Sequence, residues 1–150
     1  MLKKIGFSLL AVLIIIQFVR PGKNTDNDPQ PATDISNVYA LPDGVHDVLK
    51  QKCYDCHSNN TVYPWYTNIQ PIGWWMASHI NEGKEELNFS TFGTYAKERA
   101  DHKLEEIIEV LDEGTMPLQS YLWMHGDAAV TQEESQLITA WIVSLGIIPH

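Results

Sequence analysis

Cys53-Tyr54-Asp55-Cys56-His57 contains both cysteines of this 150-residue chain. A Cys-x-x-Cys-His sequence is the attachment site of a c-type haem. Two residues between the cysteines let both thiols reach the two vinyl groups of one porphyrin, and the adjacent histidine then projects toward the iron from the same side. The pentapeptide therefore predicts one covalent haem c per chain, with thioether bonds at Cys53 and Cys56 and with His57 as an iron ligand.

Two other uses of the pentapeptide stay open. A redox dithiol of the thioredoxin kind is expected within a βαβ pattern, which this sequence does not suggest. A zinc site would need two further ligands, for which His79, His102 and His125 are the candidates. Two cysteines are too few for a disulfide scaffold.

Apolar residues recur at helical spacing in a segment that contains the pentapeptide and in three segments after it. No segment shows a convincing alternation of polar and apolar residues, the pattern of a strand. The expected helices cover about residues 43–56, 71–87, 95–113 and 131–146. Thr131-x-x-Glu134 is a capping box at the start of the last helix, and Gly114 suits the end of the third. The last helix is expected to bury four residues: Leu137, Ile138, Trp141 and Leu145. The sequence thus predicts an all-α fold, a small cytochrome c-like bundle of about four helices around one covalently attached haem.

The first 20 residues have the pattern of a targeting segment and predict a hydrophobic helix that precedes the bundle. Lys3 and Lys4 are followed by a stretch from 5 to 19 whose only polar members are Ser8 and Gln17. Because no clear small-x-small cleavage site follows, a signal peptide and an uncleaved membrane anchor are both open. In either case the positive end stays inside and the rest is exported.

The remaining chain divides by composition. Residues 21–40 are polar and rich in proline, which is typical of a flexible linker, and the haem-binding domain is expected over 41–150. Beyond residue 20 the chain carries 7 basic and 19 acidic side chains, a net charge of −12. Such a charge argues against nucleic acid as a partner and favours a protein with a basic docking patch.

The second axial ligand of the iron is less determined than the first. Met116 precedes Pro117 in a loop after the third helix, and the proline favours an extended backbone that can aim a thioether. Histidine and methionine together are the usual ligands of electron-transfer cytochromes c. The alternative distal ligand is His79, on the apolar face of the second helix, and His125, Met76 or an open position are further options.

Aromatic side chains are concentrated just after the pentapeptide. Four of them are expected to wall the haem and to bond its propionates, although core packing would explain them as well: Tyr63, Trp65, Trp74 and Trp75. The second ring nitrogen of His57 also needs an acceptor, for which the carbonyl of Pro64 or Pro71 is the candidate.

Several stretches resemble one protein family. They are Cys53 to Asn59, Thr61-x-Tyr63-Pro64-Trp65-Tyr66, Pro71-x-x-Trp74-Trp75, His79 to Lys84 with Leu87 to Ser90, and Met116-Pro117 followed by Tyr121 and His125. Over about residues 41–146 the chain is similar to the bacterial haem-binding domain family, small exported monohaem proteins that are like c-type cytochromes. The resemblance implies covalent haem at Cys53 and Cys56 with His57 as ligand. From residues 1–20 we expect the domain on the periplasmic side of the bacterial inner membrane, anchored there or secreted to the periplasm.

The functional expectation follows from these features. No nucleophile elbow, phosphate-binding loop or readable carboxylate pair is present, so we expect an electron carrier rather than an enzyme. The leading hypothesis is an exported monohaem cytochrome c that passes electrons to a redox partner protein, attached to the membrane if residues 1–20 stay uncleaved. The alternative is a haem protein with an open or weakly ligated distal site, which acts as a peroxidase-like enzyme or a sensor of diatomic gases.

Overall fold

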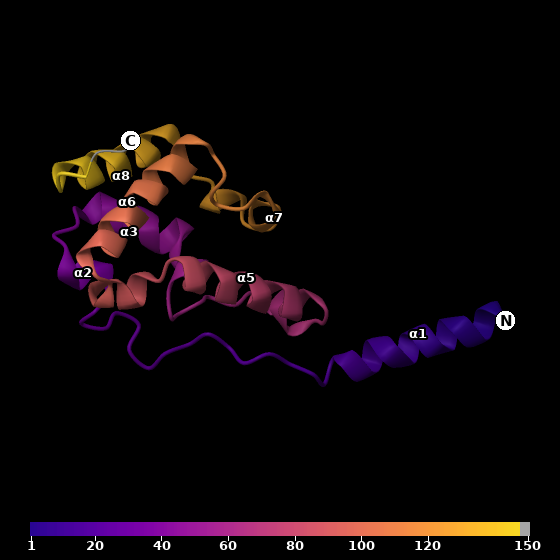
Figure 1. Ribbon diagram of the computed structural model, residues 1–150. Helices are drawn as coiled ribbons and strands as arrows, with labels where there is room; N and C mark the ends of the chain where they lie inside the picture. Colours follow the sequence, from indigo (N-terminus) through magenta and orange to yellow (C-terminus); the bar gives the residue numbers. More distant parts are fainter. Residues whose placement is uncertain (148–150) are drawn as a thin grey trace.

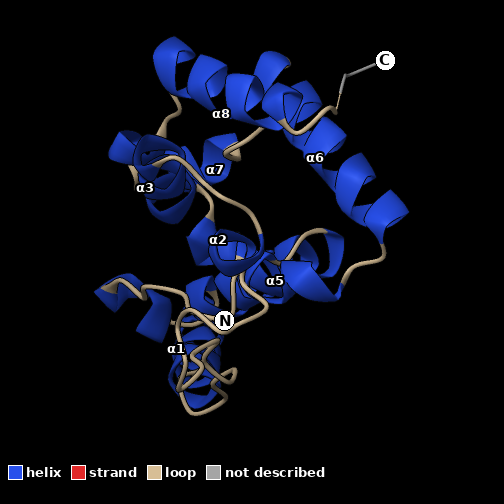
Figure 2. Cartoon of the chain, turned by 90° about the vertical axis from the view of Figure 1, so that its left-hand side faces the viewer, coloured by secondary structure: helices blue, strands red, loops and turns tan. Residues whose placement is uncertain are grey.

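The fold is known from a computed structural model that describes residues 1–147. Its helices are α1 (Leu2–Ile16), α2 (Ile35–Val38), α3 (Asp43–Lys52), α4 (Tyr54–His57), α5 (Ile72–Glu86), α6 (Lys97–Asp112), α7 (Gln119–Leu122) and α8 (Gln132–Ser144). Three short 3-10 helices lie between them: η1 (Trp65–Asn68), η2 (Phe89–Thr94) and η3 (Gly126–Ala128). Over residues 1–147 no strand forms, apart from one isolated bridge between Thr25 and Asn60. The all-α prediction is confirmed (Figure 2).

The four expected helices correspond to α3 with α4, α5, α6 and α8. The first is interrupted at Cys53, whose φ of −122° and ψ of −36° separate α3 from the single turn of α4. The capping box forms as expected, because the Thr131 hydroxyl accepts from the Glu134 N–H and the Glu134 carboxylate accepts from the Thr131 N–H. Gly114 follows the end of α6 with a φ of +66°, a left-handed backbone conformation that residues with a side chain rarely adopt.

The core lies where α3, α6 and α8 pack together. α6 packs on α8, and α8 packs on α3 (Figure 1). Leu104 of α6 and Ile138 and Ile142 of α8 are completely buried, and each such side chain is worth about 1.5–3 kcal/mol relative to exposure. The buried face of α8 differs in part from the predicted one. Leu137 and Leu145, which were expected to be buried, remain more than a third exposed, and Ile142 is buried instead.

α5 belongs to a second group of elements, on the other side of the pentapeptide. It packs on α4 and on η1 (Figure 1). We call the turn of residues 53–57, where haem attachment is predicted, the attachment turn. Gly83 lies so close to it that a Cβ there would be 3.0 Å from the Cys56 carbonyl oxygen. The absence of a side chain at Gly83 therefore sets how closely α5 approaches the two cysteines.

The polar segment before α3 is packed on the domain, unlike the flexible linker expected for residues 21–40. Asn24 donates from its side chain to the Ser58 carbonyl oxygen at 2.8 Å and to the Thr61 hydroxyl at 2.9 Å. Asp34 is completely buried and accepts hydrogen bonds from the Ser36 N–H and the Tyr54 hydroxyl. The polar composition indicated solvent exposure, but these side chains instead satisfy polar groups of later segments.

α1 projects away from the rest of the molecule (Figure 1), and its side chains are almost all exposed. Among the residues that the structure describes, no helix is both long and apolar enough to cross a membrane. The end of α1 is nevertheless joined to the domain, because the Gln17 side chain donates to the Gln70 carbonyl oxygen and accepts from the Gln70 N–H.

Candidate haem site

A cavity of about 590 Å³ separates the two groups of elements. It is lined by residues of α3, α4, α5, α6, α7 and α8 and of the 116–118 segment. A volume of this size is ordinary for a small-molecule or cofactor site. Cys53, Cys56 and His57 all line this one cavity.

The pentapeptide forms a tight turn that separates Tyr54 from its other four residues, all of which line the cavity. The N–H groups of Cys56 and His57 both donate to the Cys53 carbonyl oxygen, at 3.2 and 3.0 Å. Tyr54 points into the core and stacks on Phe89, with ring centroids 5.2 Å apart. Because Tyr54 occupies the core side, the two cysteines and His57 are left to face the cavity.

Both thiols are neutral at ordinary pH. Burial raises the pKa of Cys53 to about 12 and the pKa of Cys56 to about 11. A redox dithiol of the thioredoxin kind depends on a lowered thiol pKa, because the thiolate is the reactive form. The environment of these cysteines therefore opposes the dithiol alternative.

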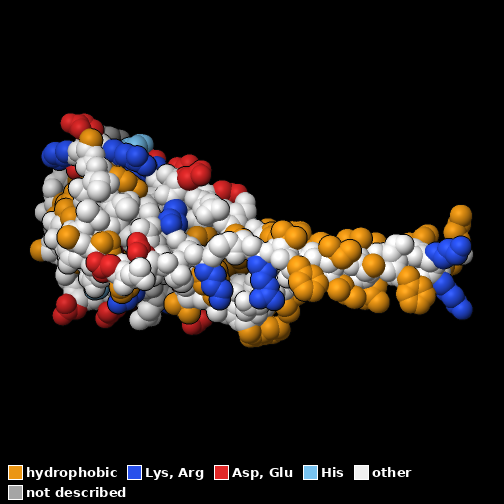
Figure 3. Space-filling view, turned by 90° about the horizontal axis from the view of Figure 1, so that it is seen from below, with side chains coloured by type: hydrophobic (Ala, Val, Ile, Leu, Met, Phe, Trp, Pro, Cys, Tyr) orange, Lys and Arg blue, Asp and Glu red, His pale blue; other side chains and the backbone are white. Residues whose placement is uncertain are grey.

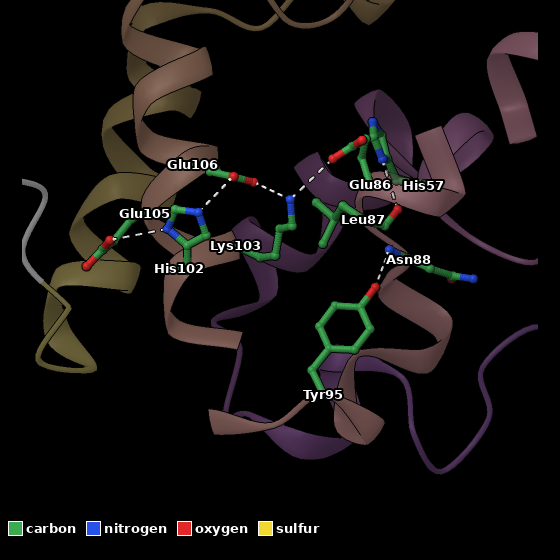
Figure 4. A network of polar contacts seen from close by, with 9 residues as sticks. All are labelled: His57, Glu86, Leu87, Asn88, Tyr95, His102, Lys103, Glu105 and Glu106. Carbon is green, nitrogen blue, oxygen red and sulfur yellow. Dashed lines mark hydrogen bonds and ion pairs between the residues drawn. The ribbon is translucent and has the colours of Figure 1, made fainter. Parts of the chain in front are cut away.

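His57 is held in one tautomer by the backbone. Its Nδ1 lies 3.0 Å from the Leu87 carbonyl oxygen (Figure 4), and a carbonyl can only accept, so Nδ1 carries the proton. In this tautomer Nε2 carries the lone pair that could bind a metal, as expected of a histidine ligand with its outer acceptor in place. The acceptor is thus Leu87 and not Pro64 or Pro71. Desolvation lowers the pKa of His57, which keeps the ring neutral.

Three of the candidate distal ligands line the cavity: Met116, His79 and Met76. The His79 ring lies edge-on against Trp75 at 4.6 Å, and its Nδ1 lies 3.5 Å from a Glu82 carboxylate oxygen. His125 is not part of the wall. It is engaged elsewhere, since its Nε2 lies 3.1 Å from the Tyr66 hydroxyl and its ring stacks on Tyr121 at 4.1 Å.

Only one of the four expected aromatic residues, Trp75, lines the cavity. Tyr63 accepts a hydrogen bond from the Asn24 N–H at 2.7 Å, and the Trp74 indole N–H donates to the Val19 carbonyl oxygen at 2.7 Å. Trp65 is 74% exposed. The structure thus places three of the four aromatic side chains near the segment that follows α1 or on the surface, where the pattern of aromatic residues alone suggested a haem wall.

Two polar residues at the cavity were not assigned a role from the sequence. Tyr121 donates its hydroxyl to the Asp55 carboxylate at 2.8 Å, so a residue of the pentapeptide is tied to α7. Burial and this hydrogen bond raise the pKa of Tyr121. Lys103 of α6 pairs with Glu106 at 2.6 Å and with Glu86 of α5 at 3.4 Å (Figure 4). Lys103 therefore links the two walls of the cavity.

The donor set fits haem better than a bare metal ion. In residues 1–147, no three His, Cys, Asp or Glu side chains are gathered closely enough to hold a metal ion. This arrangement opposes the zinc alternative, which needs about four such ligands. Two thiols from one turn, a histidine with a free Nε2 and apolar walls are instead the groups that a c-type haem requires.

An all-helical domain with this cavity and this donor set defines a class, the helical haem-binding proteins. The model of the haem-binding domain family matches residues 11–144, and the chain belongs to that family. The match begins before residue 41, in agreement with the packing of the 24–37 segment. Comparison with curated proteins and with solved structures found no match.

Proposed function

We propose that this haem-binding protein is an exported monohaem c-type cytochrome that carries electrons and catalyses no reaction of its own. Cys53 and Cys56 would hold the haem through thioether bonds, and His57 and Met116 would be its axial ligands. The observation that carries the proposal is that both thiols, His57 and Met116 line one cavity, with His57 Nδ1 held by the Leu87 carbonyl oxygen. When bound, the haem supplies an iron that gains and loses one electron.

The protein's own residues prepare the site before haem enters. The Leu87 carbonyl oxygen fixes the tautomer of His57, so no proton has to leave Nε2 when the ring becomes a ligand. The raised pKa values keep these half-buried thiols neutral, which slows premature oxidation, since the thiolate is the form that oxidises. Tyr121 and Asp55 fix the turn against α7.

The arrangement of the helices favours Met116 over His79 as the distal ligand. His79 and Met76 belong to α5, and α5 lies against the attachment turn through the contact of Gly83 with Cys56. They therefore come from the helix that packs on the turn of His57. Met116 comes from the segment after α6, which also lines the cavity, and a thioether from there would complete the usual His/Met pair.

Absorption and spin-state spectra of three alanine variants test the axial ligands. Met116→Ala should convert a low-spin six-coordinate spectrum to a high-spin one and remove the methionine-to-iron charge-transfer band. His79→Ala should leave both features, and so should Met124→Ala, a control methionine that is 63% exposed. A high-spin spectrum in the unmodified protein, or loss of the band in His79→Ala, would contradict the assignment. Haem staining of a denaturing gel separately tests attachment at Cys53 and Cys56.

One observation supports the alternative of a reactive distal site. His79 lines the cavity with the Glu82 carboxylate 3.5 Å from its Nδ1, an arrangement able to move a proton near a bound peroxide. Carbon monoxide separates the two functions. Rapid and complete binding by the reduced protein would favour a peroxidase-like enzyme or gas sensor, and no binding would favour the electron carrier.

The partner and the location belong to the same proposal. The −12 charge beyond residue 20 favours a redox partner with a basic patch, so the electron-transfer rate should fall as salt rises. A rate that does not depend on salt would contradict such docking. Residues 1–20 would direct the chain to the periplasmic side of the bacterial inner membrane, as an anchor or as a cleaved signal. The mass of the mature protein from the membrane fraction distinguishes these two.

A further inference from the structure

A patch of exposed apolar side chains lies on the domain where α1 meets it. It comes from η1 and the start of α5, and its members are Trp65 (74% exposed), Ile69 (43%), Ile72 (41%) and Trp74 (37%). We call these four residues the collar. Figure 3 shows that apolar side chains cover α1 and continue onto the domain at its junction. An exposed apolar patch continuous with an apolar helix needs a partner, because neither surface gains from contact with water.

The collar is fastened to the end of α1. The side chain of Gln17 exchanges two hydrogen bonds with the backbone of Gln70, at 3.0 and 2.9 Å. The Trp74 indole N–H donates to the Val19 carbonyl oxygen at 2.7 Å. Both contacts bring the collar up to the point where the apolar stretch of α1 ends. A surface that holds α1 would therefore meet the collar as well.

The charge around the collar is opposite to that of the rest of the protein. Residues 1–25 and 56–81 contain no Asp or Glu, although the chain has 19 acidic residues. The charged side chains next to the collar are Arg20 and Lys23, which line a small pocket against η1 and α5, and Lys23 lies over the Tyr63 ring at 5.3 Å. Figure 3 shows basic side chains at the junction. Two cations beside exposed tryptophans complement the phosphates of lipid headgroups.

We propose that the collar is a lipid-binding surface, seated in the headgroup region of the bilayer that holds α1. The inference rests on the membrane anchor of the proposed function and extends it from α1 to the folded domain. Tryptophan is enriched at this depth because its ring is apolar while its N–H is polar. Arg20 and Lys23 bind the headgroup phosphates, and the acidic remainder of the domain faces water.

Tryptophan fluorescence tests the collar separately from the anchor, because α1 contains no tryptophan. The full chain is mixed with vesicles of phosphatidylcholine and phosphatidylglycerol, with or without bromine on the acyl chains. Brominated lipid should quench the fluorescence. The double variant Trp65→Phe with Trp74→Phe should lose most of the quenching while it keeps the apolar surface. Trp123→Phe, which removes a tryptophan that is 75% exposed on another segment, should keep it.

Co-sedimentation with the same vesicles reports whether the chain binds the bilayer at all, through α1 or through the collar. A chain that sediments with vesicles but is not quenched would overturn the collar and leave the anchor standing. A chain that does not sediment would overturn both, and haem staining would still decide the haem site. Quenching that persists in the double variant would assign lipid contact to another face.

A second pair of variants tests whether the collar is instead an interface between copies of this chain. Trp65→Ser with Ile72→Ser is compared with Leu137→Ser with Val143→Ser, whose residues are 41% and 44% exposed on α8. The collar pair should weaken vesicle binding and the α8 pair should not. A lipid-free dimer, found by analytical ultracentrifugation and lost only in the collar pair, would overturn the lipid assignment.

Discussion

Gly83→Ala should destabilise the domain although alanine is the better helix former. Ordinary van der Waals contacts of a Cβ begin at about 3.4 Å. The new Cβ would lie 3.0 Å from the Cys56 carbonyl oxygen and 3.3 Å from the Cys56 Cβ. Both atoms belong to the attachment turn, which cannot turn aside as the tip of a flexible side chain can. α5 would therefore have to move away from α4.

The expected magnitude is a balance of two effects. Overpacking in a well-packed region costs about 1–3 kcal/mol. Alanine in place of glycine within a helix returns up to about 1 kcal/mol. The net effect on the free energy of unfolding is then a loss of about 1 kcal/mol, which lowers the melting temperature by roughly 2–8 °C for domains of this size range.

Gly44→Ala is the matched control. Gly44 lies in α3, and its Cβ would meet only the Cδ2 atom at the end of Leu137, at 3.1 Å. Because Leu137 is 41% exposed, its tip can rotate away and the gain in helix propensity should dominate. Circular dichroism during heating compares the two variants. If Gly83→Ala raises the melting temperature as much as Gly44→Ala does, α5 does not pack on the attachment turn as described.

Three further predictions concern the groups that line or close the cavity. At pH 8 the haem-free thiols should alkylate much more slowly than free cysteine, because desolvation raises both thiol pKa values and leaves little thiolate. Cys53, whose pKa is raised more, should be the slower of the two; peptide mass spectrometry measures both rates, and fast labelling without urea would contradict the desolvation. Tyr121→Phe should cost about 1–2 kcal/mol at pH 8. The pKa of Tyr121 is raised in the folded state, so above about pH 10, the pKa of tyrosine in the unfolded chain, ionisation favours unfolding of the unmodified protein only. The difference in unfolding free energy between the two proteins should therefore shrink as pH rises above about 10; a difference from urea denaturation that stays constant with pH would contradict the raised pKa. Lys103→Gln should cost no more than about 1 kcal/mol at low salt, since its partner Glu86 is largely exposed, and thermal melts should show less difference at high salt; a loss independent of salt would assign Lys103 to packing.

The pentapeptide and the helices could be predicted because their signals are local. The spacing Cys53-x-x-Cys56-His57 brings two thiols and an imidazole together within five residues, and a capping box or a terminal glycine acts within one turn. The break at Cys53 was not predictable in the same way, because the apolar spacing continues across it. The tertiary packing of Tyr54 against Phe89 accompanies that break.

The rest of the site depends on contacts between distant segments. The acceptor of His57 is a backbone carbonyl at Leu87, and a carbonyl has no signature in the sequence. Trp65 and Trp74 are residue types that often line a haem. In the structure Trp74 donates to the Val19 carbonyl oxygen after α1 and Trp65 is exposed, which their residue types do not indicate. Lys103 carried a weak local signal, its i,i+3 spacing to Glu106, but its pairing with Glu86 joins two helices.

If α1 anchors the chain and the haem carries electrons, as proposed, the packed segment between α1 and α3 limits how far the haem could travel. A free tether of 20 residues would let the domain wander by about 25 Å from its anchor. Here the segment between α1 and α3 is fixed along the domain by Asn24 and Asp34, and little free chain is left after α1. A haem carried in this way could not search the space above the membrane for its partner. Encounters would have to come from lateral diffusion of one protein or the other, at a nearly constant height.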